Sequence, residues 1–192
     1  MDIVFASNNK HKLSEVRNIL DKYNILSLEQ IGFNAEIEEN GKTIEENAFI
    51  KVRTIRAYTD KIIIADDTGL FVKALNGEPG VYSARYAGEN ATFADNNKKL
   101  LKALEGKKNR QAVFKCAVAL NMPNGEEKIF IGEVQGSIAA KASGDSGFGY
   151  DPIFIFDKLN TTYAQMSIEQ KDLLSHRAKA LFKLAQFIES LK

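Results

Sequence analysis

The segment IIIADDTGL, residues 62–70, constrains the fold more than any other stretch of this chain. Its three isoleucines and alanine predict a buried β-strand, and that strand runs directly into Asp66 and Asp67. Burying an unpaired carboxylate costs several kcal/mol, so each aspartate must be paired, hydrogen-bonded or bound to a metal. Because successive side chains of a strand point to opposite faces, we expect the two carboxylates to diverge rather than to share a proton.

Strands linked by helices and strands linked by hairpins both occur along the chain. An apolar run at 2–6 precedes a polar loop and a helical spacing that starts at Leu13. A T-x-x-E capping sequence at 43–46 opens a second helix, and another capping start, from Thr92 to Asp95, opens a third. The runs at 111–121 and 126–138 predict paired strands, because a Pro-Asn-Gly turn separates them. This mixture predicts an α/β fold with a mixed β-sheet and flanking helices.

The C-terminal part is predicted to be one long helix that begins with the capping sequence at 167–170 and runs close to Lys192. Its expected buried stripe leaves His176 and Arg177 to one side, where they line a cleft or meet water. The stripe comprises Leu173 or Leu174, Ala178, Leu181, Leu184 or Ala185, and Ile188.

Composition narrows the class of protein. The net charge of +1 argues against nucleic acid or an anionic membrane as the main partner. One cysteine, Cys116, forms no internal disulfide, which suits a reducing cytoplasm, and we find neither a signal peptide nor a membrane span. We therefore expect a single cytoplasmic domain of residues 1–192.

The loop SNNKHK, residues 7–12, lies where a strand meets the N-terminus of a helix. Backbone N–H groups and the helix dipole favour an anion there, and Ser7, Asn9 and Lys12 add a hydroxyl, an amide and an ammonium. The loop lacks the Walker pattern. It predicts a phosphate site, and a solvated helix start is the alternative.

A second source of carboxylates is the acidic segment EIEENG, residues 36–41. Carboxylates from two segments near a phosphate loop indicate an oxygen-ligated hard cation such as Mg²⁺. Taken alone, Glu38 and Glu39 also fit a solvated turn, and Asp67 also fits a helix or turn cap.

The glycine-rich segment SGFGYDP, residues 146–152, offers Gly147 and Gly149 for close backbone approach. Phe148 stands between them and could stack on a planar ligand, whereas the alternative is a turn whose aromatic side chains pack inward.

Six segments, in this order and spanning nearly the whole chain, together resemble the inosine triphosphate pyrophosphatase family. They are SNNKHK (7–12), EENGKTIEENAFIK (38–51), ADDTGL (65–70), GEPGVYSARYAG (77–88), SGFGYDPIF (146–154) and SHRAKAL (175–181). This chain has Ser7, Asn8 and Thr68 where the family commonly has threonine, glycine and serine. None of these differences removes a group that the chemistry needs.

The resemblance implies an elongated, two-lobed single domain with the nucleotide in a central cleft, and a homodimer that requires Mg²⁺. It implies hydrolysis of ITP, dITP and XTP between the α and β phosphates to the nucleoside monophosphate and pyrophosphate. By the same resemblance Asp67 is a metal ligand and the general base, and Asp66 serves nearby backbone or a second metal. The second ligand is Glu38 or Glu39, and counting back from Gly41 favours Glu38.

The resemblance also assigns the substrate contacts. Ser7, Asn8, Asn9, Lys10, His11, Lys12 and Lys51 hold the triphosphate, Thr68 contacts the nucleotide, and Phe148, Gly149, Tyr150, Asp151, Lys171, His176 and Arg177 lie on the base side. Arg177 is a donor fork that matches a 6-keto oxygen and mismatches the 6-amino group of adenine.

Two other functions fit parts of the pattern. A nucleotide-binding sensor without turnover would use the same cleft, but the presence of Asp67, Glu38 and Lys12 together favours catalysis. A pyrophosphatase for other modified nucleotides is the second alternative, and the SGFGYDP and SHR motifs argue against it.

Overall fold

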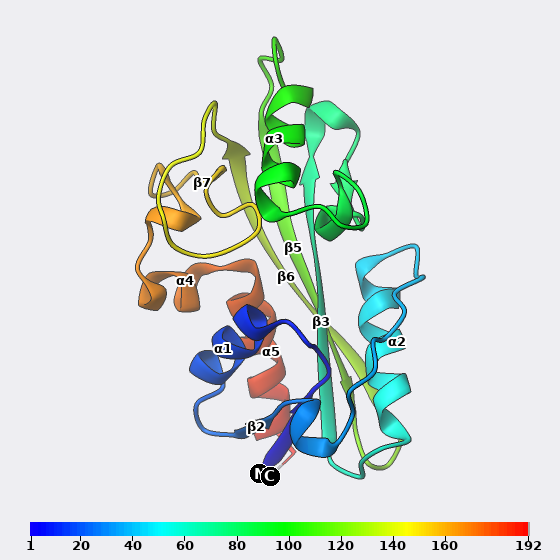
Figure 1. The fold of residues 1–192 in the computed structure, drawn as a ribbon. Helices are drawn as coiled ribbons and strands as arrows, with labels where there is room; N and C mark the ends of the chain where they lie inside the picture. The colour runs from blue at the N-terminus through cyan, green and yellow to red at the C-terminus, as the bar shows by residue number, and fades with distance from the viewer. Residues whose placement is uncertain (192) are drawn as a thin grey trace. The chain divides into compact units, whose positions relative to one another are not determined.

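The structure is a computed structural model that describes residues 1–191 (Figure 1). Within these residues, eight strands form one sheet in the order β2-β1-β3-β5-β6-β7-β8, and β4 pairs with β3. The strands are β1 Asp2–Phe5, β2 Asn24–Leu26, β3 Ile62–Val72, β4 Pro79–Gly80, β5 Gln111–Asn121, β6 Glu127–Ile138, β7 Phe154–Phe156 and β8 Thr161–Thr162. The α-helices are α1 Lys10–Ile19, α2 Ile44–Arg56, α3 Phe93–Ala103, α4 Ile168–Leu174 and α5 His176–Glu189, and short 3₁₀ helices lie at Glu29–Ile31, Lys73–Leu75, Ser83–Arg85 and Tyr163–Gln165.

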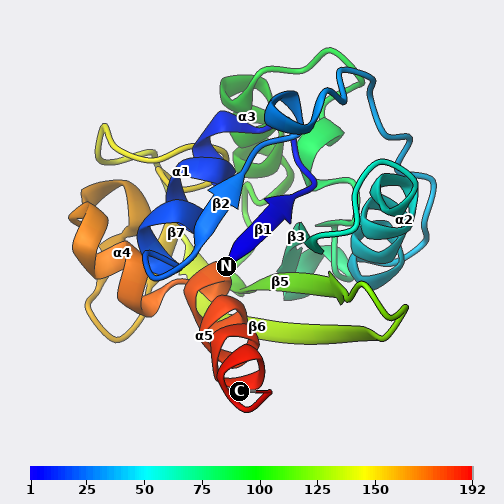
Figure 2. The same cartoon turned by 90° about the horizontal axis from the view of Figure 1, so that it is seen from below.

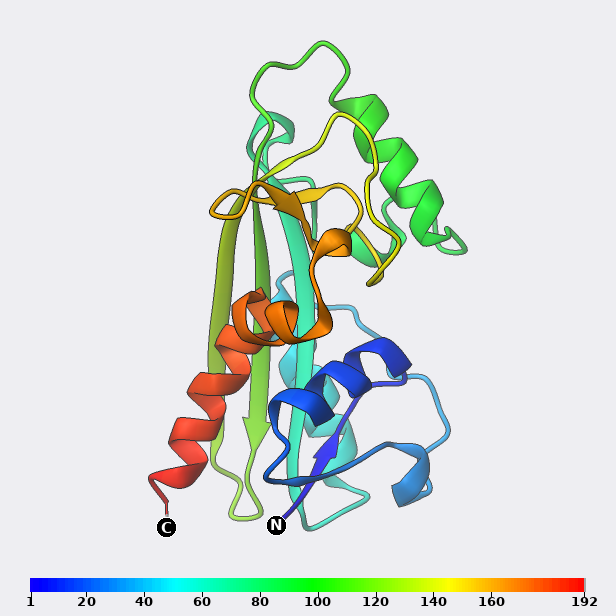
Figure 3. The same ribbon diagram turned by 90° about the vertical axis from the view of Figure 1, so that its left-hand side faces the viewer.

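The sheet is mixed, as the sequence predicts. β1 pairs in parallel with β2 and β3, whereas β3–β4, β6–β7 and β7–β8 are antiparallel pairs. The predicted turn joins β5 to β6, and the Met122 N–H donates to the Glu126 carbonyl at 2.8 Å (Figure 3). The prediction of an α/β fold with a mixed sheet and flanking helices is confirmed.

Contacts between residues divide the chain into two compact units. Unit 1 comprises Met1–Asp67, Cys116–Gly132 and the chain from Asp172 onward, and unit 2 comprises Thr68–Lys115 and Glu133–Lys171. Strands β3, β5 and β6 contribute residues to both units.

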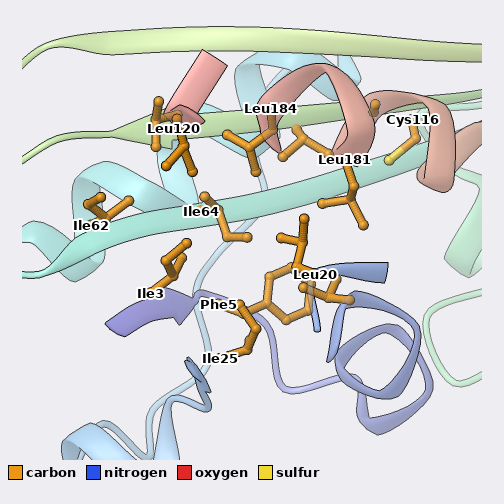
Figure 4. Close-up of a cluster of buried hydrophobic side chains, with 14 residues drawn as sticks. Ile3, Phe5, Leu20, Ile25, Ile62, Ile64, Cys116, Leu120, Leu181 and Leu184 are labelled. Carbon is orange, nitrogen blue, oxygen red and sulfur yellow. The ribbon is translucent and has the colours of Figure 1, made fainter. Parts of the chain in front are cut away.

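In unit 1, α1 and α5 cover one face of the sheet and α2 covers the other (Figure 2). Ile62 and Ile64 of β3 share a buried cluster with Leu181 and Leu184 of α5 (Figure 4). Ile63, which lies between the two isoleucines, is buried outside that cluster. By the period of two, the side chain of Asp66 belongs to the α1–α5 face and the next one belongs to the α2 face.

β3 does not end at the two aspartates. We expected the carboxylates at a strand end, but the strand continues to Val72, and Leu70 and Phe71 pair with β4. The motif IIIADDTGL therefore lies entirely within one strand of 11 residues. The apolar run predicted the start of the strand, but it could not show the β4 partner that extends it.

The prediction of one long C-terminal helix is wrong. The chain forms α4 and then α5, and the side chain of Ser175 between them accepts a hydrogen bond from the Ala178 N–H. The predicted stripe is correct within α5, where Ala178, Leu181, Leu184 and Ile188 are buried, but not in α4, where Leu173 is 64% exposed. His176 and Arg177, which we expected beside the stripe, are buried as well. α5 ends at Glu189, and Lys192 lies outside the described residues.

Unit 2 contains α3, β4, β7 and β8, together with the glycine-rich loop. The predicted capping box of Thr92 and Asp95 opens α3. An aromatic group packs the interior of this unit, with ring centroids 4.7 Å apart for Phe114 and Phe154 and 5.0 Å apart for Phe154 and Tyr163. No helix within residues 1–191 is long and apolar enough to cross a membrane.

Candidate active site

The predicted site residues are distributed over both units. The 7–12 loop, the acidic segment, Lys51, both aspartates, His176 and Arg177 belong to unit 1, whereas Thr68, the glycine-rich loop and Lys171 belong to unit 2.

The 7–12 loop is built around the cap of α1. The side-chain oxygen of Asn9 accepts from the backbone N–H groups of His11 and Lys12 at 3.0 and 3.2 Å. The Ser7 hydroxyl accepts from the Asn9 N–H at 3.2 Å. The loop thus caps the positive end of a helix of 10 residues with its own side chains, and the helix dipole there favours an anion. Asn8, Lys10 and His11 are exposed around it.

Asp66 lies on the α1–α5 face and is fully buried. Lys12 Nζ lies 3.1 Å from its Oδ1, and Arg177 Nε donates to its Oδ2 at 2.9 Å. The Cys116 thiol also donates to Oδ2, over 3.8 Å. Arg177 Nη1 in turn donates to Glu15 of α1. Asp66 is thus the centre of an ion-pair network that joins β3 to α1 and α5. A role toward nearby backbone or a second metal stays a prediction.

The electrostatics of Asp66 follow from these partners. Burial by itself would raise the pKa of this carboxyl, but the charges of Lys12, Arg177 and Lys51 outweigh burial and hold it below its usual range. Burial acts to lower the pKa of Lys12, but the negative charges of Asp66 and Asp67 together outweigh it, so the pKa of Lys12 is raised. Asp66 is therefore permanently ionised near neutral pH.

Asp67 lies on the α2 face, so the predicted divergence of the two carboxylates is confirmed. Its Oδ2 accepts from the side-chain amide of Asn47 at 3.0 Å, and its Oδ1 lies 3.9 Å from Lys51 Nζ. Lys51 is itself buried: its Nζ donates to the Asp66 carbonyl at 2.8 Å and lies 3.1 Å from Glu39 Oε2. Two carboxylates thus share one ammonium on this face.

The pKa of Asp67 moves in the opposite direction from that of its neighbour. Burial raises it, the charges of Lys51 and Lys12 lower it, and the negative charge of Glu39 raises it again, so the net pKa is raised. A carboxyl with a raised pKa is a stronger proton acceptor once it is ionised.

The structure separates the two candidate glutamates. Glu39 reaches Lys51 beside Asp67, whereas the side chain of Glu38 is exposed. The sequence argument that favoured Glu38 rested on counting from Gly41. Among residues 1–191, no three His, Cys, Asp or Glu side chains form a group that could hold a metal ion.

In unit 2, Asp151 organises the glycine-rich loop. Its Oδ2 accepts from the Phe148 N–H at 2.8 Å and from Lys171 Nζ at 2.5 Å. Gly147 has a φ of +77°, and a Cβ at this position would lie 2.1 Å from the same oxygen, so glycine is required there. The predicted residues Phe148, Asp151 and Lys171 therefore lie together.

The two aromatic side chains of this loop differ. Tyr150 packs inward and its hydroxyl donates to the Ser83 carbonyl at 2.8 Å, so for this residue the inward-packed alternative is correct. Phe148 is partly exposed, with Lys171 Nζ 4.8 Å from its ring centroid. Phe148 and Gly149 also line a groove of about 710 Å³ beside α3. Phe148 is thus the partly exposed aromatic side chain of the loop, and Tyr150 the buried one.

Sequence reasoning missed the residues that hold these side chains in place. Asn47 and Glu15 each contact a predicted site residue, and neither was singled out. A signal for Asn47 was present, because it lies four residues before Lys51 and so shares its helix face. Contacts between segments distant in sequence, such as that between Glu15 and Arg177, leave no such signal.

Comparison with known proteins identifies the family. The sequence model of the Ham1 family matches residues 3–187. This chain belongs to the Ham1 family. The resemblance inferred from the six segments is therefore confirmed at the level of the family.

Full-length relatives of the Ham1 family agree with this assignment. The dITP/XTP pyrophosphatase of Thermoanaerobacter pseudethanolicus is 49% identical, and the alignment covers 98% of this chain and 96% of the relative. That of Bacillus licheniformis is 47% identical, with 98% of each chain covered.

Solved structures of the family share the fold. The Ham1 protein of Staphylococcus aureus matches with a TM-score of 0.90 at 45% identity, over 100% of both chains. The nucleoside-triphosphatase, dITP/XTP pyrophosphatase, of Mycobacterium abscessus matches with a TM-score of 0.77 at 41% identity, over 96% of this chain and 98% of that one.

Proposed function

We propose that this protein is a nucleoside triphosphate pyrophosphatase that hydrolyses non-standard purine nucleotides, dITP, XTP and ITP, to the monophosphate and pyrophosphate. The full-length relatives named dITP/XTP pyrophosphatase support this substrate class. The observation that carries the chemistry is the α2 face of β3, where Asp67 and Glu39 are grouped around Lys51.

Mg²⁺ is the proposed cofactor. Asp67 and Glu39 supply hard oxygen donors of the type that Mg²⁺ prefers, and this ion typically uses one or two carboxylates together with water and substrate phosphates. The raised pKa of Asp67 fits a site where a cation adds the positive charge that favours the ionised carboxylate. When bound, the ion would neutralise negative charge on the phosphate oxygens. We propose Glu39 in place of Glu38 as the second ligand because of its contact with Lys51.

Asp67 is the proposed general base. Asn47 donates to its Oδ2, and its Oδ1 lies 3.9 Å from Lys51 Nζ. We propose that Oδ1 is the atom that meets the attacking water. Accepting the proton from water at this atom would generate the nucleophile that attacks the α-phosphorus. A buried carboxylate with a raised pKa suits this role, because a general base works best when its pKa lies near the operating pH.

Lys12 and the N-terminus of α1 are proposed to hold the triphosphate. Both put positive charge where the pyrophosphate leaving group develops negative charge, which lowers the barrier without a further proton transfer. The pairing of Lys12 with Asp66 holds its ammonium in one place before substrate arrives. Lys51, which is directed toward the two carboxylates, is proposed to balance their charge as well as to assist phosphate binding.

Base recognition is proposed for Phe148, Asp151 and Lys171, with Thr68 on the nucleotide. Gly149, Tyr150 and His176 complete the residues that the family resemblance places on this side. Reading of the 6-keto group by Arg177 stays a prediction, since its guanidinium is 2% exposed and donates to Asp66 and Glu15. A homodimer and a cytoplasmic location are further parts of the proposal.

The decisive experiment is a pyrophosphate-release assay with Mg²⁺ over a panel of dITP, XTP, ITP, ATP, GTP and dUTP. We expect dITP, XTP and ITP to be cleaved in clear preference to the standard nucleotides, with one pyrophosphate and one monophosphate formed per substrate. Release of orthophosphate, or equal rates across the panel, would reject the proposal.

A further inference from the structure

We propose that Asn47 is a positioning residue that holds Asp67 and Glu39 together for the metal and the attacking water. The inference rests on the proposed function and concerns a residue that acts through Asp67 and Glu39. Asn47 lies in the first turns of α2, and its side chain is buried with 2% of its surface exposed.

Asn47 makes one hydrogen bond with each of its two side-chain groups. Its amide nitrogen donates to Asp67 Oδ2 at 3.0 Å, and its amide oxygen accepts from the Gly41 N–H at 2.8 Å. The orientation of the amide is fixed by chemistry, because a backbone N–H only donates and an ionised carboxylate only accepts. A side chain at this position must therefore donate in one direction and accept in the other.

The bond to Gly41 fastens the end of the acidic segment to α2. The next amide, that of Lys42, donates to Glu46 Oε2 at 2.6 Å, so two consecutive backbone N–H groups bind side chains of the first turns of the helix. The approach is close: a Cβ on Gly41 would lie 2.6 Å from Asn47 Oδ1 and 2.8 Å from Glu46 Cβ. Only glycine fits this contact without a shift.

Fastening Gly41 also places Glu39, which lies two residues earlier. Glu39 meets Lys51 at 3.1 Å, and Lys51 lies one helical turn after Asn47 on the same face of α2. Asn47 thus bonds both to Asp67 and to the backbone of the segment that carries Glu39. Partners of this kind orient the groups that bind a metal, and their loss typically costs about 10- to 100-fold in affinity or activity.

Hydrogen exchange of the wild-type protein gives the first test and needs no variant. The Gly41 amide lies outside every helix and strand, yet its bond to a buried side chain should protect it, unlike the amides of exposed loops. Exchange of Gly41 at the rate of an unprotected loop amide, measured by NMR, would overturn the proposal.

The second test compares Asn47→Ala with Asn121→Ala. Asn121 is a matched control, because it is a buried asparagine of the same unit whose side-chain oxygen and nitrogen are both hydrogen-bonded, to Arg56 and Glu127. We expect both variants to unfold at a lower temperature than wild type. Only Asn47→Ala should raise the Mg²⁺ concentration that gives half of the maximal rate, by about tenfold or more.

A readout independent of turnover is the rise of the unfolding temperature on addition of Mg²⁺. The Mg²⁺ concentration needed for this rise should be higher in Asn47→Ala than in wild type. In Asn121→Ala it should equal the wild-type concentration. Asn47→Asp retains an acceptor for Gly41, so it should keep the Gly41 amide protected, whereas Asn47→Ala should expose it. Equal Mg²⁺ dependence of the two alanine variants would show that Asn47 is merely structural and would overturn the proposal. A wild-type protein that releases no pyrophosphate from any triphosphate would instead reject the proposed function.

Discussion

The two faces of β3 carry adjacent aspartates in opposite electrostatic states. On the α1–α5 face, Asp66 is paired with Lys12 and Arg177, and its pKa is lowered. On the α2 face, Asp67 is hydrogen-bonded to Asn47, with Lys51 3.9 Å away, and its pKa is raised. The same residue type, one position apart, is thus held as a fixed anion on one face and as a basic carboxyl on the other.

The difference teaches how a buried carboxylate is stabilised. Burial acts on both side chains and raises the pKa of each, so burial alone does not distinguish them. The number and the distance of the positive charges decide the outcome. Asp66 is compensated within the protein, which suits a structural ion pair, whereas Asp67 still favours an additional cation, which suits a metal ligand and base.

The largest expected effect is on stability and concerns Asp66. In Asp66→Asn the buried Lys12 and Arg177 lose their shared counter-charge, and breaking a buried pair of this kind costs about 3–5 kcal/mol. Urea unfolding of the metal-free protein at neutral pH measures the loss. Asp67→Asn is the matched control and should not be destabilised, because it removes a charge that burial disfavours. Equal losses in the two variants would refute the distinction between the faces.

The next effect is on catalysis and concerns Asp67. Asp67→Asn keeps the shape of the side chain but removes the ligand charge and the proton acceptor, so pyrophosphate release should fall at least about a hundredfold. The rate with saturating dITP and Mg²⁺ measures the fall. A rate within a few-fold of wild type would mean that neither role belongs to this side chain.

The pH dependence of stability should separate the two aspartates further. The lowered pKa of Asp66 contributes stability that is present above the unfolded value, about 4, and is lost as pH falls through the folded value. The raised pKa of Asp67 contributes stability to the metal-free protein at low pH that is lost as pH rises through the folded value. Each contribution changes by at most about 1.4 kcal/mol per pH unit.

The measurement for this prediction is urea unfolding of the wild type and of both asparagine variants between pH 3 and pH 8. The deficit of Asp66→Asn should shrink on acidification, whereas any gain of Asp67→Asn should appear only on going to neutral pH. Parallel pH profiles for the two variants would contradict the assignment.

The smallest effects concern lysines. Lys12→Ala should raise the KM for the triphosphate by about tenfold or more, because it removes a charged hydrogen bond to phosphate. Lys51→Ala should weaken Mg²⁺ use and phosphate binding through loss of its contacts with Glu39 and Asp67. Lys107→Ala, at an exposed position, should change neither, and steady-state kinetics of all three variants would show it. Identical kinetics in the three would mean that local charge does not hold the phosphates.

Local patterns in the sequence predicted much of the fold and part of the site. The capping sequences at residues 43–46 and 92–95, the helical spacing from Leu13 and the Pro-Asn-Gly turn all correspond to observed helix starts and to the observed hairpin. These features depend on neighbours a few residues apart, so a single chain contains them. The divergence of the two aspartates was predictable for the same reason, since it follows from the period of a strand.

Other features depended on distant segments. The sequence did not show that the strand continues to Val72, because the β4 pairing that extends it comes from elsewhere in the chain. It did not show that Ser175 ends one helix and caps the next, and so it misplaced Arg177. Counting back from Gly41 favoured Glu38, and it could not show that Glu39 is the glutamate that reaches Lys51.

The sequence alone thus determined the kind of chemistry in this protein: an acidic segment, two carboxylates on a buried strand, a polar loop at a helix N-terminus and the six segments typical of its family. Only the tertiary structure decided which partners and which electrostatic state each carboxylate has. The pKa of a buried acid depends on the charges within a few ångströms, and those charges come from α1, α2 and α5, brought to β3 by packing. Asp66 and Asp67 are the same residue type at adjacent positions. Their pKa values move in opposite directions because Arg177 and Lys12 lie on one face of the strand and Asn47 lies on the other.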